Sequence, residues 1–124
     1  MPELMEFDCR YYKEDKFIMG SHYRYRTLSG KLIDIPEGFI TDLASVPKMF
    51  RNVFNTYGKN YTRAAVVHDY LYAQGYKMGI DRKQADEIFL EIMKERGVNF
   101  FKRNLMYWSV RVAGRRHYRK GAII

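Results

Sequence analysis

The stretch that decides the fold of the second half of the chain lies at residues 64–72. It reads Ala64-Ala65-Val66-Val67-His68-Asp69-Tyr70-Leu71-Tyr72. An apolar run of this length predicts a partly buried helix. His68 and Tyr72 are four residues apart and share a face of it, whereas Asp69 points about 100° away from His68. An imidazole exchanges protons near neutral pH, so His68 is a candidate catalytic group. The alternative is a buried histidine that satisfies neighbouring polar groups.

The segment before this helix is predicted to form strands. Residues 5–11 alternate apolar and polar side chains, which is the period of a half-buried strand. Residues 22–26 and 31–35 flank a Ser29-Gly30 turn, which favours a hairpin. We therefore expect strands over about residues 5–41.

Capping residues divide the rest of the chain into helices. Pro47 suits the first turn of a short helix. Thr62 is expected to cap the helix that contains His68, and Asp81 and Asn99 to cap two more.

The order of strands and helices predicts the fold class. Strands followed by helices indicate α+β rather than alternating βαβ units. We expect N-terminal antiparallel β-hairpins followed by three to four helices over about residues 46–118, in a single compact domain spanning residues 1–124.

Composition excludes several classes of protein. The 124 residues include one cysteine, Cys9, which excludes an internal disulfide and a multi-cysteine zinc site. No apolar run reaches the roughly 18 residues of a membrane helix, and no basic, apolar signal peptide is visible. We expect a reduced, cytosolic setting without a membrane span.

The net charge of +8 is concentrated near the end of the chain. Residues 1–62 hold nine Lys and Arg and eight acids, whereas residues 63–124 hold thirteen and six. From Asn99 onward there is no acid. A basic helix of this kind suggests an acidic partner or nucleic acid; the alternative is a solubility surface or cations that complement the helix dipole. The candidate binding surface comprises Lys102, Arg103, Arg111, Arg115, Arg116 and Arg119.

Three carboxylates on separate segments join His68 as candidate catalytic residues. Asp42 lies in a loop between a strand and a helix, Asp69 follows His68, and Asp86 lies at the edge of the apolar arc of its helix. A buried carboxylate requires a partner, which His68, an arginine or a metal ion would supply. In one interpretation His68 is a general base that Asp86 or Asp42 orients.

The same four residues also suit a divalent metal ion. Mixed histidine and carboxylate ligands are typical of such sites, and sequence spacing does not choose between a metal site at Asp42, His68, Asp69 and Asp86 and a metal-free base. The apolar residues of the last helix are expected in the core. They are Phe100, Phe101, Leu105, Met106, Trp108 and Val112.

Three separated motifs carry a family resemblance. They are residues 38–47 (GFITDLASVP), residues 64–72 (AAVVHDYLY), and Arg82 with Ala85-Asp86 and Phe89. With the basic segment from Met106 to Gly114, they resemble a phage- and prophage-encoded family known as domain of unknown function thirteen fifty-three. The resemblance covers about residues 20–115. It implies a viral origin, a compact single domain, and a place in the host cytoplasm or the virion, and it brings no established activity.

A local similarity to secreted phospholipases A2 lies in His68, Asp69 and Tyr72. The catalytic helix of those enzymes carries His-Asp followed by Tyr at this spacing, and a second helix supplies an Asp that holds the His, a role for Asp81 or Asp86. There the His activates water and the adjacent Asp binds calcium. This chain lacks their disulfides and has no glycine-rich calcium loop before the pair.

Two functions from different classes follow. The first is a small phage hydrolase with a His/Asp site, metal-assisted or not, acting on the cell wall or another host substrate. The second is a non-enzymatic phage protein whose basic C-terminal helix binds a virion component, a host protein (as an inhibitor or anti-defence factor) or nucleic acid. Convergence of the four candidate residues on an open cleft favours the first. Dispersal, or sealing with every polar atom paired, favours the second.

Overall fold

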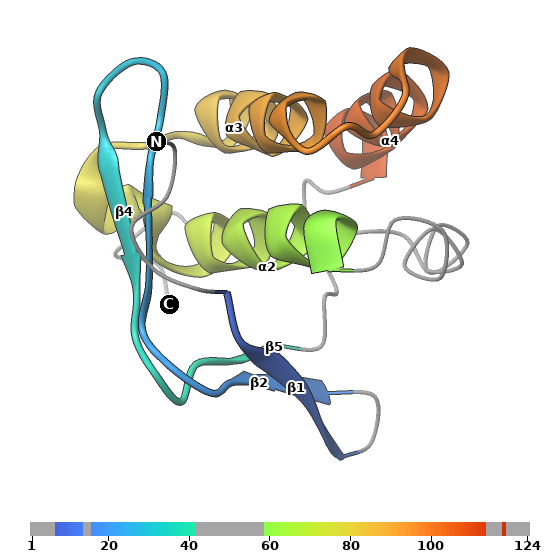
Figure 1. Cartoon of the computed structure of the whole chain (residues 1–124). Coiled ribbons are helices and arrows are strands. Elements are labelled where there is room, and N and C mark those ends of the chain that lie inside the picture. Colours follow the sequence, from blue (N-terminus) through green and yellow to red (C-terminus); the bar gives the residue numbers. More distant parts are fainter. Residues whose placement is uncertain (1–6, 14–15, 42–58, 114–117, 119–124) are drawn as a thin grey trace. The chain divides into compact units, whose positions relative to one another are not determined.

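The computed structural model describes residues 7–13, 16–41, 59–113 and 118 (Figure 1). The chain divides into two compact units, Met1–Asp42 and Leu43–Ile124. Several predictions lie outside the described residues: the short helix at 46–55, Asp42, Arg115, Arg116 and Arg119. The single domain over residues 1–124 stays a prediction.

The first unit holds two small antiparallel sheets. One has the strand order β1 (Cys9–Lys13), β2 (Lys16–Met19) and β5 (Ile40–Thr41). The other pairs β3 (Tyr23–Arg26) with β4 (Leu32–Ile35). The predicted antiparallel strands are therefore present, in two small sheets.

The β3–β4 hairpin shows why its residues form strands. Tyr23 pairs with Ile35 and Tyr25 with Ile33, and all four side chains are buried. Alternate residues of a strand share one face, so these four side chains point to one side, and Arg24, Arg26, Leu32 and Asp34 point to the other. Gly30 has a φ of 95° in the connecting turn, a conformation that glycine adopts without steric cost.

The second unit is helical. It contains α2 (Lys59–Gln74), the short 3₁₀ helix η2 (Gly75–Met78), α3 (Arg82–Glu95) and α4 (Phe100–Ala113). α2 packs against α3, and α3 packs against α4 (Figure 1). Strands followed by helices confirm the predicted α+β fold. None of the helices in the described ranges is long and apolar enough to cross a membrane.

Two of the three predicted helix caps are confirmed. The Asp81 carboxylate accepts from the Gln84 backbone N–H at 2.8 Å, and the Gln84 side chain accepts from the Asp81 N–H at 3.0 Å, which is a capping box. Asn99 accepts from the Lys102 N–H at 2.9 Å. The prediction for Thr62 is wrong: α2 already begins at Lys59, so Thr62 lies inside the helix.

The prediction that α4 buries most of its apolar residues is wrong. Met106 and Val110 are buried, and they occupy the face that meets α3. The other predicted core residues are exposed: Phe100, Phe101, Leu105, Trp108 and Val112. α4 carries apolar side chains on two opposite faces, and a helical pattern does not say which face points inward.

Candidate functional site

Four side chains from three helices meet at one carboxylate. His68 and Tyr72 come from consecutive turns of α2, Asp86 from α3 and Arg111 from α4. The Asp86 Oδ1 atom lies 2.6 Å from His68 Nε2 and accepts from the Tyr72 hydroxyl at 2.6 Å. The Oδ2 atom accepts from Arg111 Nη1 at 2.8 Å. We call these four residues the Asp86 network.

The Asp86 network is sealed from solvent at its centre. The side chains of His68 and Asp86 have 0% exposure. Burial raises the pKa of Asp86, but the hydrogen bonds from His68, Tyr72 and Arg111 outweigh it, so that the pKa lies below its ordinary value. The carboxylate is therefore ionised at neutral pH and can only accept, which makes His68 Nε2–H the donor of their bond.

The neighbours of Asp86 respond to its charge. Burial, followed by the hydrogen bond to Asp86, raises the pKa of Tyr72, so its hydroxyl keeps its proton and donates. The hydrogen bond to Asp86 raises the pKa of Arg111. The His68 ring also packs against two aromatic rings, with centroid distances of 4.3 Å to Tyr72 and 4.6 Å to Phe89.

A second arginine joins α3 to α4 beside the network. Arg82, the first residue of α3, donates from Nη2 to the Val110 carbonyl at 3.0 Å and also to the Arg111 carbonyl. Carbonyls in the last turn of a helix have no partner within it, so Arg82 caps the C-terminal end of α4. A cation at that position also matches the helix dipole.

Comparison with known proteins assigns the family. The family model for "Protein of unknown function (DUF1353)" matches residues 17–110. The chain belongs to the DUF1353 family. The match contains His68, Tyr72 and Asp86 and ends one residue before Arg111. A search of curated proteins and a search of solved structures each found no match.

The structure of this DUF1353 protein brings two of the four candidate catalytic residues together. His68 and Asp86 are in contact, whereas Asp69 lies half-buried on the next position of α2. Within the described ranges, no three His, Cys, Asp or Glu side chains gather in a way that would hold a metal ion. Because Asp42 lies outside those ranges, the predicted metal site stays a prediction.

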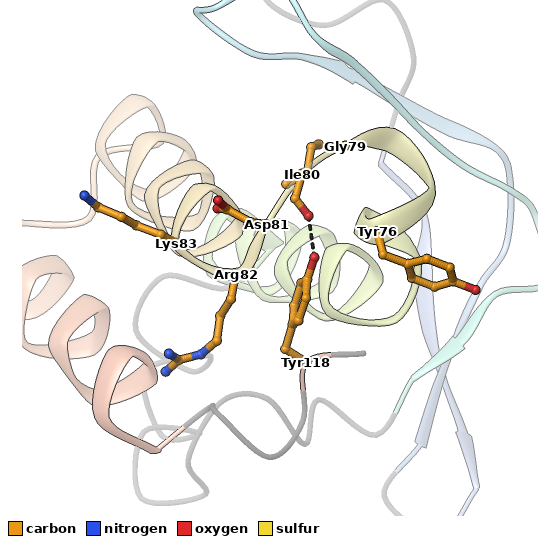
Figure 2. A pocket seen from close by; sticks show the side chains of 7 residues that line it. All are labelled: Tyr76, Gly79, Ile80, Asp81, Arg82, Lys83 and Tyr118. Carbon is orange, nitrogen blue, oxygen red and sulfur yellow. Dashed lines mark hydrogen bonds between the residues drawn. The ribbon is translucent and has the colours of Figure 1, made fainter. Parts of the chain in front are cut away.

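The pocket described in this DUF1353 protein borders the Asp86 network, because Tyr118 of its lining packs edge-on against Tyr72 with ring centroids 5.4 Å apart. It has a volume of about 580 Å³ and is lined by Tyr76, residues 79–83 and Tyr118, so it includes neither His68 nor Asp86. Figure 2 shows the Tyr118 hydroxyl pointing at the Ile80 carbonyl, to which it donates at 2.5 Å. The opening therefore borders the start of α3.

Two of the cations predicted as a binding surface also have structural partners. Arg111 is 25% exposed and bonds Asp86, and Arg103 donates to the Val98 carbonyl at 3.1 Å. Lys102, on the first turn of α4, is half-buried. Part of the positive charge therefore holds α4 in place.

The sequence did not point to Arg82 or Arg111 as structural partners of the site. Arg82 lies between Asp81 and Lys83, and Arg111 lies between Val110 and Val112; neither local pattern says which group the arginine meets. The available indication of such a partner was Asp86 itself, which lies at the edge of an apolar arc. A carboxylate in that position requires a partner of opposite charge.

Proposed function

We propose that this protein is a small phage-encoded binding protein that presents the outer face of α4 to a partner. The carrying observation is the exposure of four apolar side chains along one side of α4, Phe101, Leu105, Trp108 and Val112. We call these four residues the α4 stripe. Contiguous exposed apolar surface marks interaction sites on soluble domains. The family resemblance of the three motifs supports the phage origin.

Burial of the Asp86 network supports a structural role for it in this proposal. A general base must reach the proton that it removes, and the His68 and Asp86 side chains have no exposed surface. Both Asp86 oxygens are occupied by donors from His68, Tyr72 and Arg111. The network therefore joins α2 and α4 through α3 and fixes the orientation in which α4 presents its stripe.

Selection from a random peptide library tests the docking function without a known partner. Peptides are selected on the wild-type protein and then tested on a variant with Leu105→Ser and Trp108→Ser. We expect most selected peptides to lose binding to this variant, because interface energy concentrates in a few large apolar side chains. Leu28→Ser, at an exposed apolar residue in the other unit, is the matched control. Peptides that bind both variants equally contradict the proposal.

One observation favours a second candidate, a hydrolase. Asp86, on a second helix, contacts His68 at Nε2 and accepts from Tyr72 on the same oxygen, and an Asp on a second helix that holds the His is what the similarity to secreted phospholipases A2 implies. In this candidate His68 acts as general base through Nδ1, because its Nε2–H donates to Asp86, and the reaction requires a local opening that brings water to the buried ring. Asp86 would then orient His68, and Asp69 and Asp42 remain as its proposed catalytic or metal-binding companions.

A substrate panel separates this candidate from the binding function. Wild-type protein and a His68→Asn variant, checked for helical circular dichroism, are assayed on peptidoglycan, a carboxylic ester and a phosphodiester, with and without calcium or magnesium. The hydrolase predicts turnover by the wild type and none by folded His68→Asn. Equal turnover by both proteins, or none by either, contradicts it.

A further inference from the structure

We propose that the side chain of Tyr118 is a latch that separates the pocket at the start of α3 from the Asp86 network. In the closed state that the structure shows, the Tyr118 ring covers the ring of Tyr72. When the Tyr118 ring swings out, the pocket extends to the Tyr72 hydroxyl. This inference concerns access to the network, and it depends on neither the docking function nor the hydrolase.

The Tyr118 ring contacts the pocket and the network at once. It lines the pocket of about 580 Å³. It also packs edge-on against the Tyr72 ring, with centroids 5.4 Å apart and an angle of 87° between the planes. Tyr72 is buried, whereas Tyr118 is half-buried. The Tyr118 ring therefore lies between solvent in the pocket and a donor of the buried carboxylate.

Arg82 is a second pocket residue that meets the network, and it is firmly anchored. Burial and the hydrogen bond to Asp86 raise the pKa of Tyr72, whereas the charge and a hydrogen bond of Arg82 act to lower it. The guanidinium therefore lies beside the Tyr72 hydroxyl. Because Arg82 also donates to the Val110 and Arg111 carbonyls of α4, it forms a fixed wall of the pocket.

A single hydrogen bond tethers the Tyr118 side chain. Its hydroxyl donates to the Ile80 carbonyl at 2.5 Å (Figure 2), and within the described ranges this is its one hydrogen bond. Burial and the charge of Asp81 raise the pKa of Tyr118, so the hydroxyl keeps its proton and stays a donor. One hydrogen bond between neutral groups changes an opening equilibrium by a factor of about 2 to 10. The ring can therefore open while the buried network stays intact, as a local opening does.

Opening of the latch changes the chemistry of the pocket. The Ile80 carbonyl loses its donor, and the Tyr72 hydroxyl faces the space that the Tyr118 ring has left. A molecule that takes this space must donate a hydrogen bond to the carbonyl and lie against an aromatic ring, as water or a small phenol does. The open latch is also a route by which water would reach His68, which the hydrolase candidate requires.

Hydroxyl-radical footprinting with mass spectrometry tests the latch, because the oxidation rate of an aromatic side chain follows its exposure to solvent. The rate at Tyr72 is divided by the rate at Phe89, a residue of α3 with 0% exposure. Tyr118→Phe removes only the tether, and we expect it to raise this ratio by about 2- to 10-fold. Tyr118→Ala, which also removes the ring, should raise the ratio further.

The matched control is Tyr76→Ala. Tyr76 lines the same pocket, and its ring lies 5.8 Å from the Lys77 Nζ atom. This variant removes a tyrosine ring from the pocket wall without touching the latch, so the oxidation ratio should stay at the wild-type value.

Each other outcome overturns the proposal in a recognisable way. An unchanged ratio in Tyr118→Ala means that another group covers Tyr72. A rise with Tyr118→Ala but not with Tyr118→Phe means that the hydroxyl does not hold the ring closed. An equal rise in Tyr76→Ala assigns the cover to the whole pocket wall. Faster oxidation of Tyr72 and Phe89 together indicates loosening of the entire helical unit. None of these results involves the α4 stripe, so the docking function stands or fails separately.

Discussion

Removing one oxygen atom from Tyr72 tests the Asp86 network most directly. Tyr72→Phe deletes the hydroxyl that donates to Asp86 Oδ1 at 2.6 Å and leaves the ring in place. A hydrogen bond to a charged group contributes about 1.5–3 kcal/mol. The Tyr72 side chain is buried, so water does not replace the lost donor. His68 still donates to the same oxygen. We therefore expect the free energy of unfolding to fall by about 2 kcal/mol.

Urea unfolding followed by helical circular dichroism measures this loss. The slope of the unfolding free energy against urea concentration should be the same in both proteins, because unfolding exposes the same surface area in each. Tyr12→Phe, on β1 at an exposed position, is the control, and its change should stay within about 0.5 kcal/mol. The Tyr72 hydroxyl lowers the pKa of Asp86, so Tyr72→Phe should also unfold at higher pH on acidification. A Tyr72→Phe protein as stable as the control refutes this account of the network.

Three further predictions concern acid, Arg82 and Cys9. The pKa of Asp86 is lowered in the folded protein, which means that the ionised carboxylate stabilises the folded state. This contribution is fully present above the unfolded pKa of about 3.9 and is lost as the pH falls through the folded pKa. The difference in urea midpoint between wild type and Asp86→Asn should therefore narrow below about pH 4; a constant difference contradicts this. Arg82→Met leaves the Val110 and Arg111 carbonyls without their donor, and it should lower the free energy of unfolding in urea by about 1–3 kcal/mol. Arg82→Lys should recover part of this free energy. If Arg82→Lys is as unstable as Arg82→Met, the capping role is contradicted. Burial, with a smaller effect of Asp8, raises the pKa of Cys9 to about 11, so iodoacetamide should alkylate the native thiol about 100-fold more slowly than the unfolded one; equal rates contradict the burial.

The fold was predictable wherever local chemistry decides it. Asp81 and Asn99 were recognised as caps because their side-chain oxygens bond backbone N–H groups three residues later, which depends on local sequence alone. Thr62 has the same chemistry, yet the helix starts three residues earlier, at Lys59. A capping residue inside a helix is not distinguishable from one at its start when the preceding residues also suit a helix.

The site was predictable in part. Asp86 needed a partner because it borders an apolar arc, and His68 was among the named options. That Arg111 fills the second oxygen depends on the packing of α4 against α3, which sequence spacing does not contain. The same limit explains the error on α4. Trp108 and Met106 are equally apolar by residue type, and only the position of α3 makes one exposed and the other buried.

The sharing of one carboxylate by three helices has a consequence for how the helical unit opens. If α2 loosens, Asp86 loses the donors His68 and Tyr72, and if α4 loosens it loses Arg111, while the other helix still covers part of the carboxylate. An ionised group left short of donors in a partly buried place is costly. Separate fraying of the central turns is therefore unfavourable. The slowest-exchanging amides of α2, α3 and α4 should share one opening free energy in native-state hydrogen exchange, as residues of a single cooperative unit do, and substitution of Asp86 should let the three helices exchange independently.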